Sequence, residues 1–223
     1  MMKQQANFVF RIYPLVVVCE LLLIGFQLPE WRWFTKPLLM PLLFLGFYVG
    51  SANRNSNGFY FIVAALVLSW AGDVLLQMNG MFIQGLISFL LAHIFYIMYF
   101  ISSNPGKKGM LQLHPLIGIP VLLYIVLFLW ILFPFLDALK IPVTVYGITI
   151  GAMLLMSINM QRKTNNMAAT YFIVGALLFV VSDSLLAVNL FAYSSMLLSL
   201  CVMLTYASAQ YLIVKGALQH EVE

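Results

Sequence analysis

Apolar side chains fill eight long runs of this chain, and short polar segments separate each run from the next. Most runs approach the roughly 20 residues that a helix needs to cross about 30 Å of hydrocarbon. A membrane-spanning strand would instead alternate apolar and polar positions. The pattern therefore predicts eight transmembrane helices, the second of them short and tilted or starting in the membrane interface. The predicted spans are residues 8–28, 37–50, 59–77, 82–101, 113–133, 141–160, 167–191 and 194–215.

The composition agrees with this pattern. Of the 223 residues, 63% are hydrophobic and only 8% are charged, which is far from the balance of a soluble globular domain. The segments between the runs, such as 53–58 and 104–109, are rich in Asn and Gly, which favour turns. We expect an all-α polytopic membrane protein, a bundle of eight helices that forms a single domain over residues 1–223.

The basic residues lie mostly in the short segments at the ends of the runs, as topology determinants do. Three basic residues fall on one side of the predicted bundle: Arg32, Lys36 and Lys140. Eight fall on the other: Lys3, Arg11, Arg54, Lys107, Lys108, Arg162, Lys163 and Lys215. Because cytoplasmic loops carry the excess of Lys and Arg, this asymmetry predicts that both termini are cytoplasmic.

Two aspartates interrupt the apolar runs in similar surroundings. Asp73 lies in SWAGDVLL and Asp183 in VVSDSLLA. A carboxylate in hydrocarbon costs several kcal/mol unless it is neutral, paired or facing water, so each is a candidate functional residue. If the two meet away from bulk water, one protonated and one ionised carboxyl group is the favoured arrangement, which suits an acid and base pair.

The two aspartates also belong to a longer match. One constant offset in residue number aligns the first aspartate run and Tyr96 with the second aspartate run and Tyr206. Both aspartate spans would then run in the same direction, which permits a parallel repeat of four plus four helices. Leucine matches between membrane helices are common by chance, so the repeat is a hypothesis.

Other polar side chains within the runs are candidates for the same site. His93 and Tyr96 are three residues apart and share a helix face, so both could point into one cavity. We expect these further residues to hold substrate or water, or to tune the carboxylates: Glu20, Gln77, Tyr146, Asn189, Tyr206 and Gln210. Each could instead be a hydrogen-bond partner between helices. Lys36 could be an interfacial anchor or could bind a lipid phosphate.

Several kinds of site do not fit the sequence. The three histidines form no HExxH motif and the two cysteines have no metal-ligand spacing, so no metal and no cofactor are expected. A GxSxG elbow and a phosphate-binding Gly-rich loop are also missing from the sequence. No segment is typical of a nucleic-acid-binding module.

Taken together, the motifs resemble those of the YhhN family, the lysoplasmalogenase-like membrane proteins. The matching stretches are TKPLLMPLL (35–43), AGDVLL (71–76), FIQGLISFLLAHIFY (82–96), GALLFVVSDSLLA (175–187) and TYASAQYLI (205–213). They occur in the family's order and at about its spacing, and they cover most of the chain.

The resemblance implies an eight-span enzyme of a bacterial plasma membrane that cleaves the vinyl ether bond of lysoplasmalogens. The products would be a fatty aldehyde and glycerophospho-ethanolamine or glycerophosphocholine. Asp73 and Asp183 would be the acid and base, in either order, and His93 with Tyr96 would tune or relay the proton. Tyr146, Tyr206 and Gln210 would position substrate or water, and Lys36 would meet the phosphate.

Other functions stay open at this point. A proton-coupled transporter of lipids or small molecules could use the same aspartates to carry protons. A hydrolase of a different lipid could share the fold. A bundle whose polar residues only bond to one another would have neither activity. The sequence leaves the head group, the chain length, the side of access and the oligomeric state undetermined.

Overall fold

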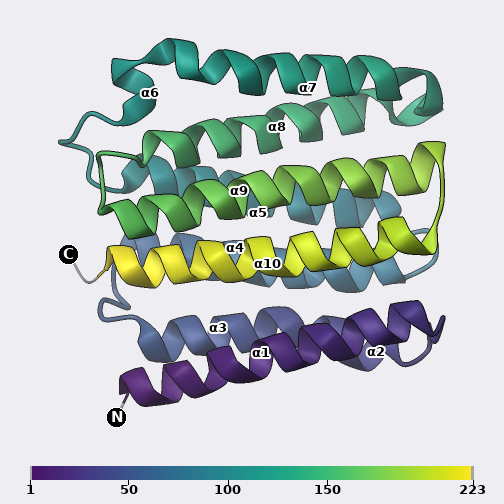
Figure 1. The fold of residues 1–223 in the computed structure, drawn as a ribbon, viewed down its shortest axis with the longest axis horizontal. Helices are drawn as coiled ribbons and strands as arrows, with labels where there is room; N and C mark the ends of the chain where they lie inside the picture. The colour runs from purple at the N-terminus through teal and green to yellow at the C-terminus, as the bar shows by residue number, and fades with distance from the viewer. Residues whose placement is uncertain (1, 222–223) are drawn as a thin grey trace.

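The computed structural model describes residues 2–221, with the side chains from residue 8 onward and that of Ala6. Within this range eight helical segments are long and apolar enough to cross a membrane, so the prediction of an all-helical, eight-span bundle is confirmed. Figure 1 shows these helices side by side, with their axes roughly aligned. The long helices are α1 (Met2–Gly25), α3 (Leu39–Gly50), α4 (Asn57–Gln77), α5 (Phe82–Ser102), α7 (Ile119–Leu132), α8 (Lys140–Asn159), α9 (Asn166–Ala187) and α10 (Met196–His220).

Short elements extend or connect the long helices. They are α2 (Arg32–Thr35), η1 (Lys36–Leu38), α6 (Met110–Leu113), η2 (Pro115–Gly118), η3 (Phe133–Phe135), η4 (Asp137–Leu139) and the π-helical η5 (Val188–Ala192). The second span is longer than the sequence pattern predicted, because α2 and η1 continue into α3 and the span begins at Arg32. The last span also continues past Lys215 to His220.

Six helices form a closed ring in the order α3, α4, α5, α8, α9 and α10, and α10 returns to contact α3. Two long helices lie outside this ring, α1 against α3 and α10, and α7 against α8. Figure 1 shows α1 and α7 at opposite edges of the bundle. The outward faces of α7 are exposed, as expected for a helix that contacts lipid.

Two helical hairpins, α4–α5 and α9–α10, supply most of the ring. Polar side chains begin three of their helices: the Ser56 hydroxyl accepts from Phe59 N (3.1 Å), Asn165 Oδ1 from Ala168 N (2.8 Å) and Ser195 Oγ from Leu198 N (3.1 Å). These caps satisfy amide groups that have no partner within the helix. Small residues let the hairpin helices approach closely, as is usual in membranes.

Candidate functional site

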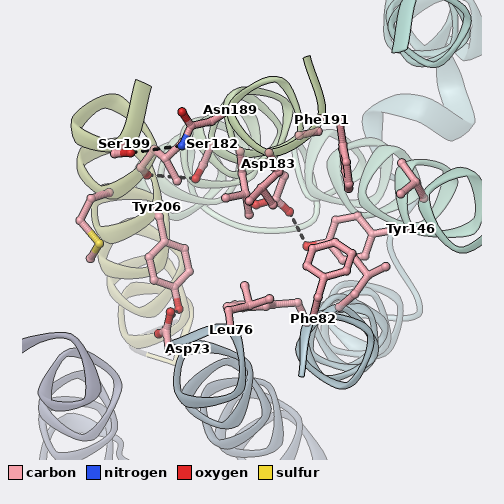
Figure 2. Close-up of a pocket in the computed structure, with 18 of the residues that line it drawn as sticks. Asp73, Leu76, Phe82, Tyr146, Ser182, Asp183, Asn189, Phe191, Ser199 and Tyr206 are labelled. Atoms are coloured by element: carbon pink, nitrogen blue, oxygen red, sulfur yellow. Dashed lines mark hydrogen bonds between the residues drawn. The ribbon is translucent and has the colours of Figure 1, made fainter. Parts of the chain in front are cut away.

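A cavity of about 260 Å³ lies inside the ring, near the ends of α4 and α9. All six ring helices or their short extensions contribute to its wall. Asp73 comes from α4 and Asp183 from α9, each four residues before its helix ends. Figure 2 shows them on different sides of the cavity, each beside a tyrosine. The structure therefore brings the two aspartates to one cavity, although no hydrogen bond joins them.

Asp73 is held by one cation and one phenol. The Tyr206 hydroxyl donates to Asp73 Oδ2 at 2.6 Å, and Lys36 Nζ lies 3.4 Å from Asp73 Oδ1. Asp73 is only 1% exposed. An ammonium and a phenol donor at a buried carboxylate both stabilise its ionised form. Lys36 reaches this position from η1 and lies inside the cavity wall, so it is a counter-ion rather than an interfacial anchor.

Asp183 has a different partner. The Tyr146 hydroxyl, from α8, donates a hydrogen bond to Asp183 Oδ2. Among the side chains that the structure describes, no lysine, arginine or histidine forms an ion pair with Asp183. The two carboxyl groups therefore share one cavity but differ in charge environment, since only Asp73 has a cation.

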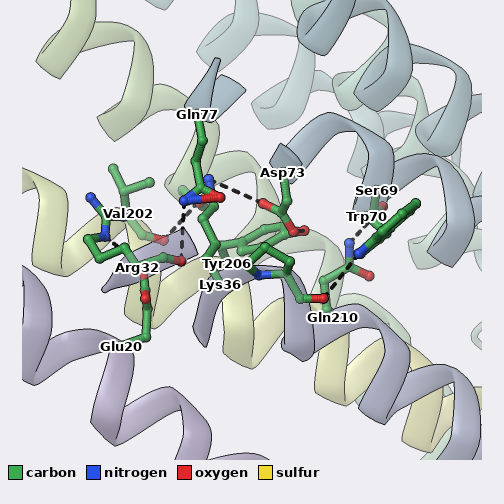
Figure 3. A network of polar contacts seen from close by, with 12 residues as sticks. Glu20, Arg32, Lys36, Ser69, Trp70, Asp73, Gln77, Val202, Tyr206 and Gln210 are labelled. Atoms are coloured by element: carbon green, nitrogen blue, oxygen red, sulfur yellow. Dashed lines mark hydrogen bonds and ion pairs between the residues drawn. The ribbon is translucent and has the colours of Figure 1, made fainter. Parts of the chain in front are cut away.

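A second polar cluster holds the segment that carries Lys36. Arg32 Nε donates to Glu20 Oε1 at 2.8 Å, and the Thr35 hydroxyl donates to Glu20 Oε2 at 2.5 Å (Figure 3). Glu20 is fully buried. The Gln77 amide donates to the Arg32 carbonyl at 3.3 Å. Glu20 and Gln77 therefore position the start of the second span and do not line the cavity.

Tyr96 and Gln210 form a network behind the site. The Tyr96 hydroxyl donates to Gln210 Oε1 at 2.5 Å, and the Gln210 amide donates to Ser69 Oγ at 2.9 Å. Tyr96 and Gln210 are fully buried. This network joins α5, α10 and α4 one turn below Asp73, so neither residue reaches the cavity.

His93 also lies outside the cavity wall. Its ring contacts the rings of Tyr146 and Phe179 edge to face, with centroids 5.4 and 4.7 Å apart. His93 is fully buried, and neither ring nitrogen has a hydrogen-bond partner of normal geometry. Phe89, one turn earlier, offers only a weaker polar contact through its backbone. His93 therefore supports the Tyr146 ring from behind.

The π-helix η5 follows Asp183 and closes one part of the cavity. Asn189 Nδ2 donates to Ser199 Oγ at 3.1 Å, and Ser195 N donates to Asn189 Oδ1 at 2.9 Å, so η5 is tied to α10. Phe191 packs edge to face on Phe82, with centroids 5.7 Å apart. Aromatic rings thus form one end of the cavity wall, on the side away from Asp73 (Figure 2).

Sequence reasoning located much of this wall. Of the predicted site residues, the cavity contains Lys36, Asp73, Tyr146, Asp183, Asn189 and Tyr206. Those outside it are Glu20, Gln77, His93, Tyr96 and Gln210. The sequence reasoning missed Arg32, which it counted only as a topology determinant. Its spacing of four residues from Lys36 was the available signal, because such residues share a helix face.

Comparison with known proteins identifies the family of the chain. The chain matches the YhhN family over residues 31–217. It is 28% identical to lysoplasmalogenase TMEM86B of Mus musculus over 212 residues, covering 93% of this chain and 86% of the relative. It is 32% identical to lysoplasmalogenase TMEM86B of Homo sapiens, with 82% and 74% covered.

A bacterial relative gives the same result. The lysoplasmalogenase of Mycobacterium tuberculosis (strain CDC 1551 / Oshkosh) is 31% identical over 163 residues, or 70% of this chain and 59% of the relative. No solved structure gives a significant match. The region that matches the family, residues 31–217, contains both aspartates and the other polar residues of the cavity wall. The chain is a multi-pass integral membrane protein and belongs to the YhhN family.

Proposed function

We propose that the protein is a membrane-embedded hydrolase that cleaves the vinyl ether bond of lysoplasmalogens to a fatty aldehyde and a glycerophospho-amine. The observation that carries the proposal is the pair of unequal carboxyl groups, Asp73 and Asp183, in one cavity within the bundle. The names of the relatives, lysoplasmalogenase in each case, support the substrate class.

The reaction needs an acid, an anion and a water molecule. A proton added to the alkene carbon farther from the ether oxygen leaves an oxocarbenium ion. Water then adds at the carbon bonded to oxygen and gives a hemiacetal, which collapses to an aldehyde and an alcohol. Paired carboxyl groups serve glycosidic bonds through a similar cation.

We assign the acid to Asp183 and the base to Asp73. Asp73 is paired with Lys36, so it is the member that stays ionised, stabilises the cation and removes a proton from water. Asp183 is beside Tyr146 without a cation, so it is the member that can hold and deliver the proton.

This assignment closes the proton cycle. After the first two steps Asp183 is ionised and Asp73 is protonated. Hemiacetal collapse then needs a proton on the leaving glycerol oxygen, which Asp73 provides. Asp183 removes the proton from the hemiacetal hydroxyl. Both carboxyl groups return to their starting states, and one water molecule has been consumed.

The remaining predicted residues receive supporting roles. Tyr206 and Tyr146 orient the two carboxyl groups, and Asn189 holds η5 against α10. We propose that His93 positions Tyr146 rather than relaying a proton itself, and that the Tyr96–Gln210 network keeps α5 and α10 in register. Lys36 is the counter-ion of Asp73 in this scheme.

The location belongs to the same proposal. We place the protein in a bacterial plasma membrane, as the sequence resemblance implied. Both termini would lie in the cytoplasm, because the basic residues gather at the end of the bundle where α1 begins and α10 ends. The cavity would then open toward the non-cytoplasmic side. A cysteine placed at Asn79 should react with an impermeant thiol reagent added from outside, and protection of that cysteine would reverse the orientation.

The proposed reaction is tested by incubating the purified protein with a lysoplasmalogen and with an ordinary lysophospholipid. We expect aldehyde from the first and no fatty acid from the second. Fatty acid release would indicate a hydrolase of another lipid. Uptake driven by a pH gradient, with the lipid chemically unchanged, would instead support a proton-coupled transporter.

A further inference from the structure

Arg32 stands between two hollows of the protein. It lines the inner cavity that contains the aspartates, and it also lines an open groove of about 400 Å³. The groove lies between the end of α1, the turn that follows it and the start of α10. Ser199 is the other residue that both hollows share. Arg32 is therefore within reach of a molecule that occupies both the cavity and the groove.

The guanidinium of Arg32 is only partly used within the protein. Its Nε donates to Glu20, whereas neither terminal nitrogen donates a hydrogen bond to any group that the structure describes. The side chain is 29% exposed. An arginine offers two parallel N–H groups in a fixed fork that matches a phosphate, so this side chain has free donors of the correct geometry.

Its position is fixed by buried groups. Glu20 is fully buried and binds Arg32 and Thr35, and Gln77 holds the Arg32 carbonyl (Figure 3). Lys36, one turn later, forms an ion pair with Asp73. Arg32 is therefore the cation of this cluster whose donors can serve a ligand.

The inner cavity also has a direction. Asp73, with Lys36 paired to it, lies on one side, and Phe82 and Phe191 form an apolar side across from Asp73 (Figure 2). Arg32 lines the cavity one turn before Lys36. A lysolipid with its vinyl ether between the aspartates would fit with its tail toward the aromatic end and its head toward Arg32. Three glycerol carbons separate the ether oxygen from the phosphate ester oxygen, so the phosphate would lie a short step beyond the reacting bond.

We propose that Arg32 binds the phosphodiester of the lipid head group, and that Glu20 positions it for this task. The proposal rests on the proposed function and identifies the specificity-determining end of the same site. Arg32 thus takes the role of phosphate ligand that the sequence analysis gave to Lys36. The outer groove would then receive the amine part of the head group.

The test compares two substrates with the same vinyl ether, a lysoplasmalogen and a 1-alkenylglycerol that lacks the phosphate. Wild type should prefer the phosphate-bearing lipid in kcat/KM. Arg32→Lys keeps a cation for Glu20 but loses the fork, so we expect this preference to fall about tenfold or more, mainly through KM. An unchanged preference, or equal losses on both substrates, would overturn the proposal.

Two further variants control for folding and charge. Glu20→Gln/Arg32→Gln avoids a buried unpaired carboxylate and should show the same loss of preference. Lys140→Gln removes a cation from the same end of the bundle whose Nζ lies over the Phe133 ring, 4.8 Å from its centroid. It should retain the wild-type preference. Inorganic phosphate should compete no better than chloride of equal ionic strength, and strong competition would assign the site to free phosphate.

Binding separates this proposal from the catalytic one. If wild type released aldehyde from neither substrate, the proposed function would fail while Arg32 could still be tested. Lysophosphatidylethanolamine should then raise the Tm of wild type more than a monoacylglycerol does, and Arg32→Lys should remove that difference. Equal stabilisation of both proteins would overturn the assignment of Arg32.

Discussion

Each side of the cavity contains an aspartate, and the two aspartates have different neighbours. The offset in residue number that relates Asp73 to Asp183 also relates Lys36 to Tyr146. Each of the first pair contacts the aspartate of its own half, Lys36 with Asp73 and Tyr146 with Asp183. One half therefore presents an ammonium where the other presents a phenol. In the proposed assignment, this difference keeps Asp73 ionised and leaves Asp183 able to hold a proton.

The largest effect is expected at Asp183, the proposed acid. Asp183→Asn removes the proton donor, and kcat for aldehyde release should fall by about 10³ to 10⁴. Asp137→Asn is a matched control, because Asp137 is exposed outside the cavity and asparagine tolerates its φ of +39°. If Asp183→Asn kept more than a tenth of wild-type kcat, Asp183 would not be the acid.

Asp73→Asn should have a smaller effect on catalysis, about 10² in kcat, because water and Tyr206 can still support the cation. The ion pair between Lys36 and Asp73 should have a larger effect on the free energy of unfolding. Lys36→Met leaves Asp73 buried without a cation and should lower the free energy of unfolding by about 3 kcal/mol.

Adding Asp73→Asn to Lys36→Met should recover most of that stability without recovering activity. Thermal unfolding in one detergent measures all four proteins of this cycle. Additive losses in the double variant would show that the two side chains do not stabilise one another.

The tyrosines give the next comparison. Tyr146→Phe removes the hydrogen bond that orients Asp183, so kcat should fall by roughly 10- to 100-fold. Tyr206→Phe leaves Asp73 with Lys36, so its loss should be below about tenfold. Steady-state kinetics on one lysoplasmalogen measures both variants, and a larger loss in Tyr206→Phe would reverse the order of importance.

The smallest effect concerns packing in the two halves. The offset that relates the two aspartates also relates Ala65 in α4 to Gly175 in α9. A Cβ at Gly175 would come within 2.8 Å of Ile213 Cγ1 and 3.1 Å of the Ala209 carbonyl oxygen. Gly175→Ala should therefore destabilise the protein by about 1–3 kcal/mol, although the other half already has alanine there.

Gly147→Ala is the control for this packing change, because the atoms nearest its Cβ would belong to the flexible Leu129 side chain, at 3.2 Å or more. Its Tm should stay close to that of wild type. Equal Tm values for Gly175→Ala and Gly147→Ala would contradict the close approach of α9 to α10.

Hydropathy predicted the spans well because burial in hydrocarbon dictates composition directly. The cost of a carboxylate in a membrane likewise identified Asp73 and Asp183 before any contact was known. The order of helices around the ring could not be obtained in the same way. His93 and Tyr96 share a face as predicted, but that face meets Phe179 and Gln210 rather than the cavity.

Arg32 is a cavity residue that the sequence could not identify, for the same reason. In sequence it is one of several basic residues beside a span, and only the buried carboxylate of Glu20 in the first span places it at the cavity. The parallel repeat and the cytoplasmic position of the termini stay predictions. The single offset that relates both aspartates also relates one partner of each, Lys36 and Tyr146, which adds support to the repeat.

The central claim is that Asp183 holds a proton, whereas the ion pair with Lys36 keeps Asp73 ionised. Infrared difference spectroscopy of the resting protein near neutral pH tests it directly, through the carbonyl stretch of a protonated carboxyl group. We expect this band to be lost in Asp183→Asn and retained in Asp73→Asn. A band that is lost in Asp73→Asn and retained in Asp183→Asn would contradict the division of labour between the two carboxyl groups.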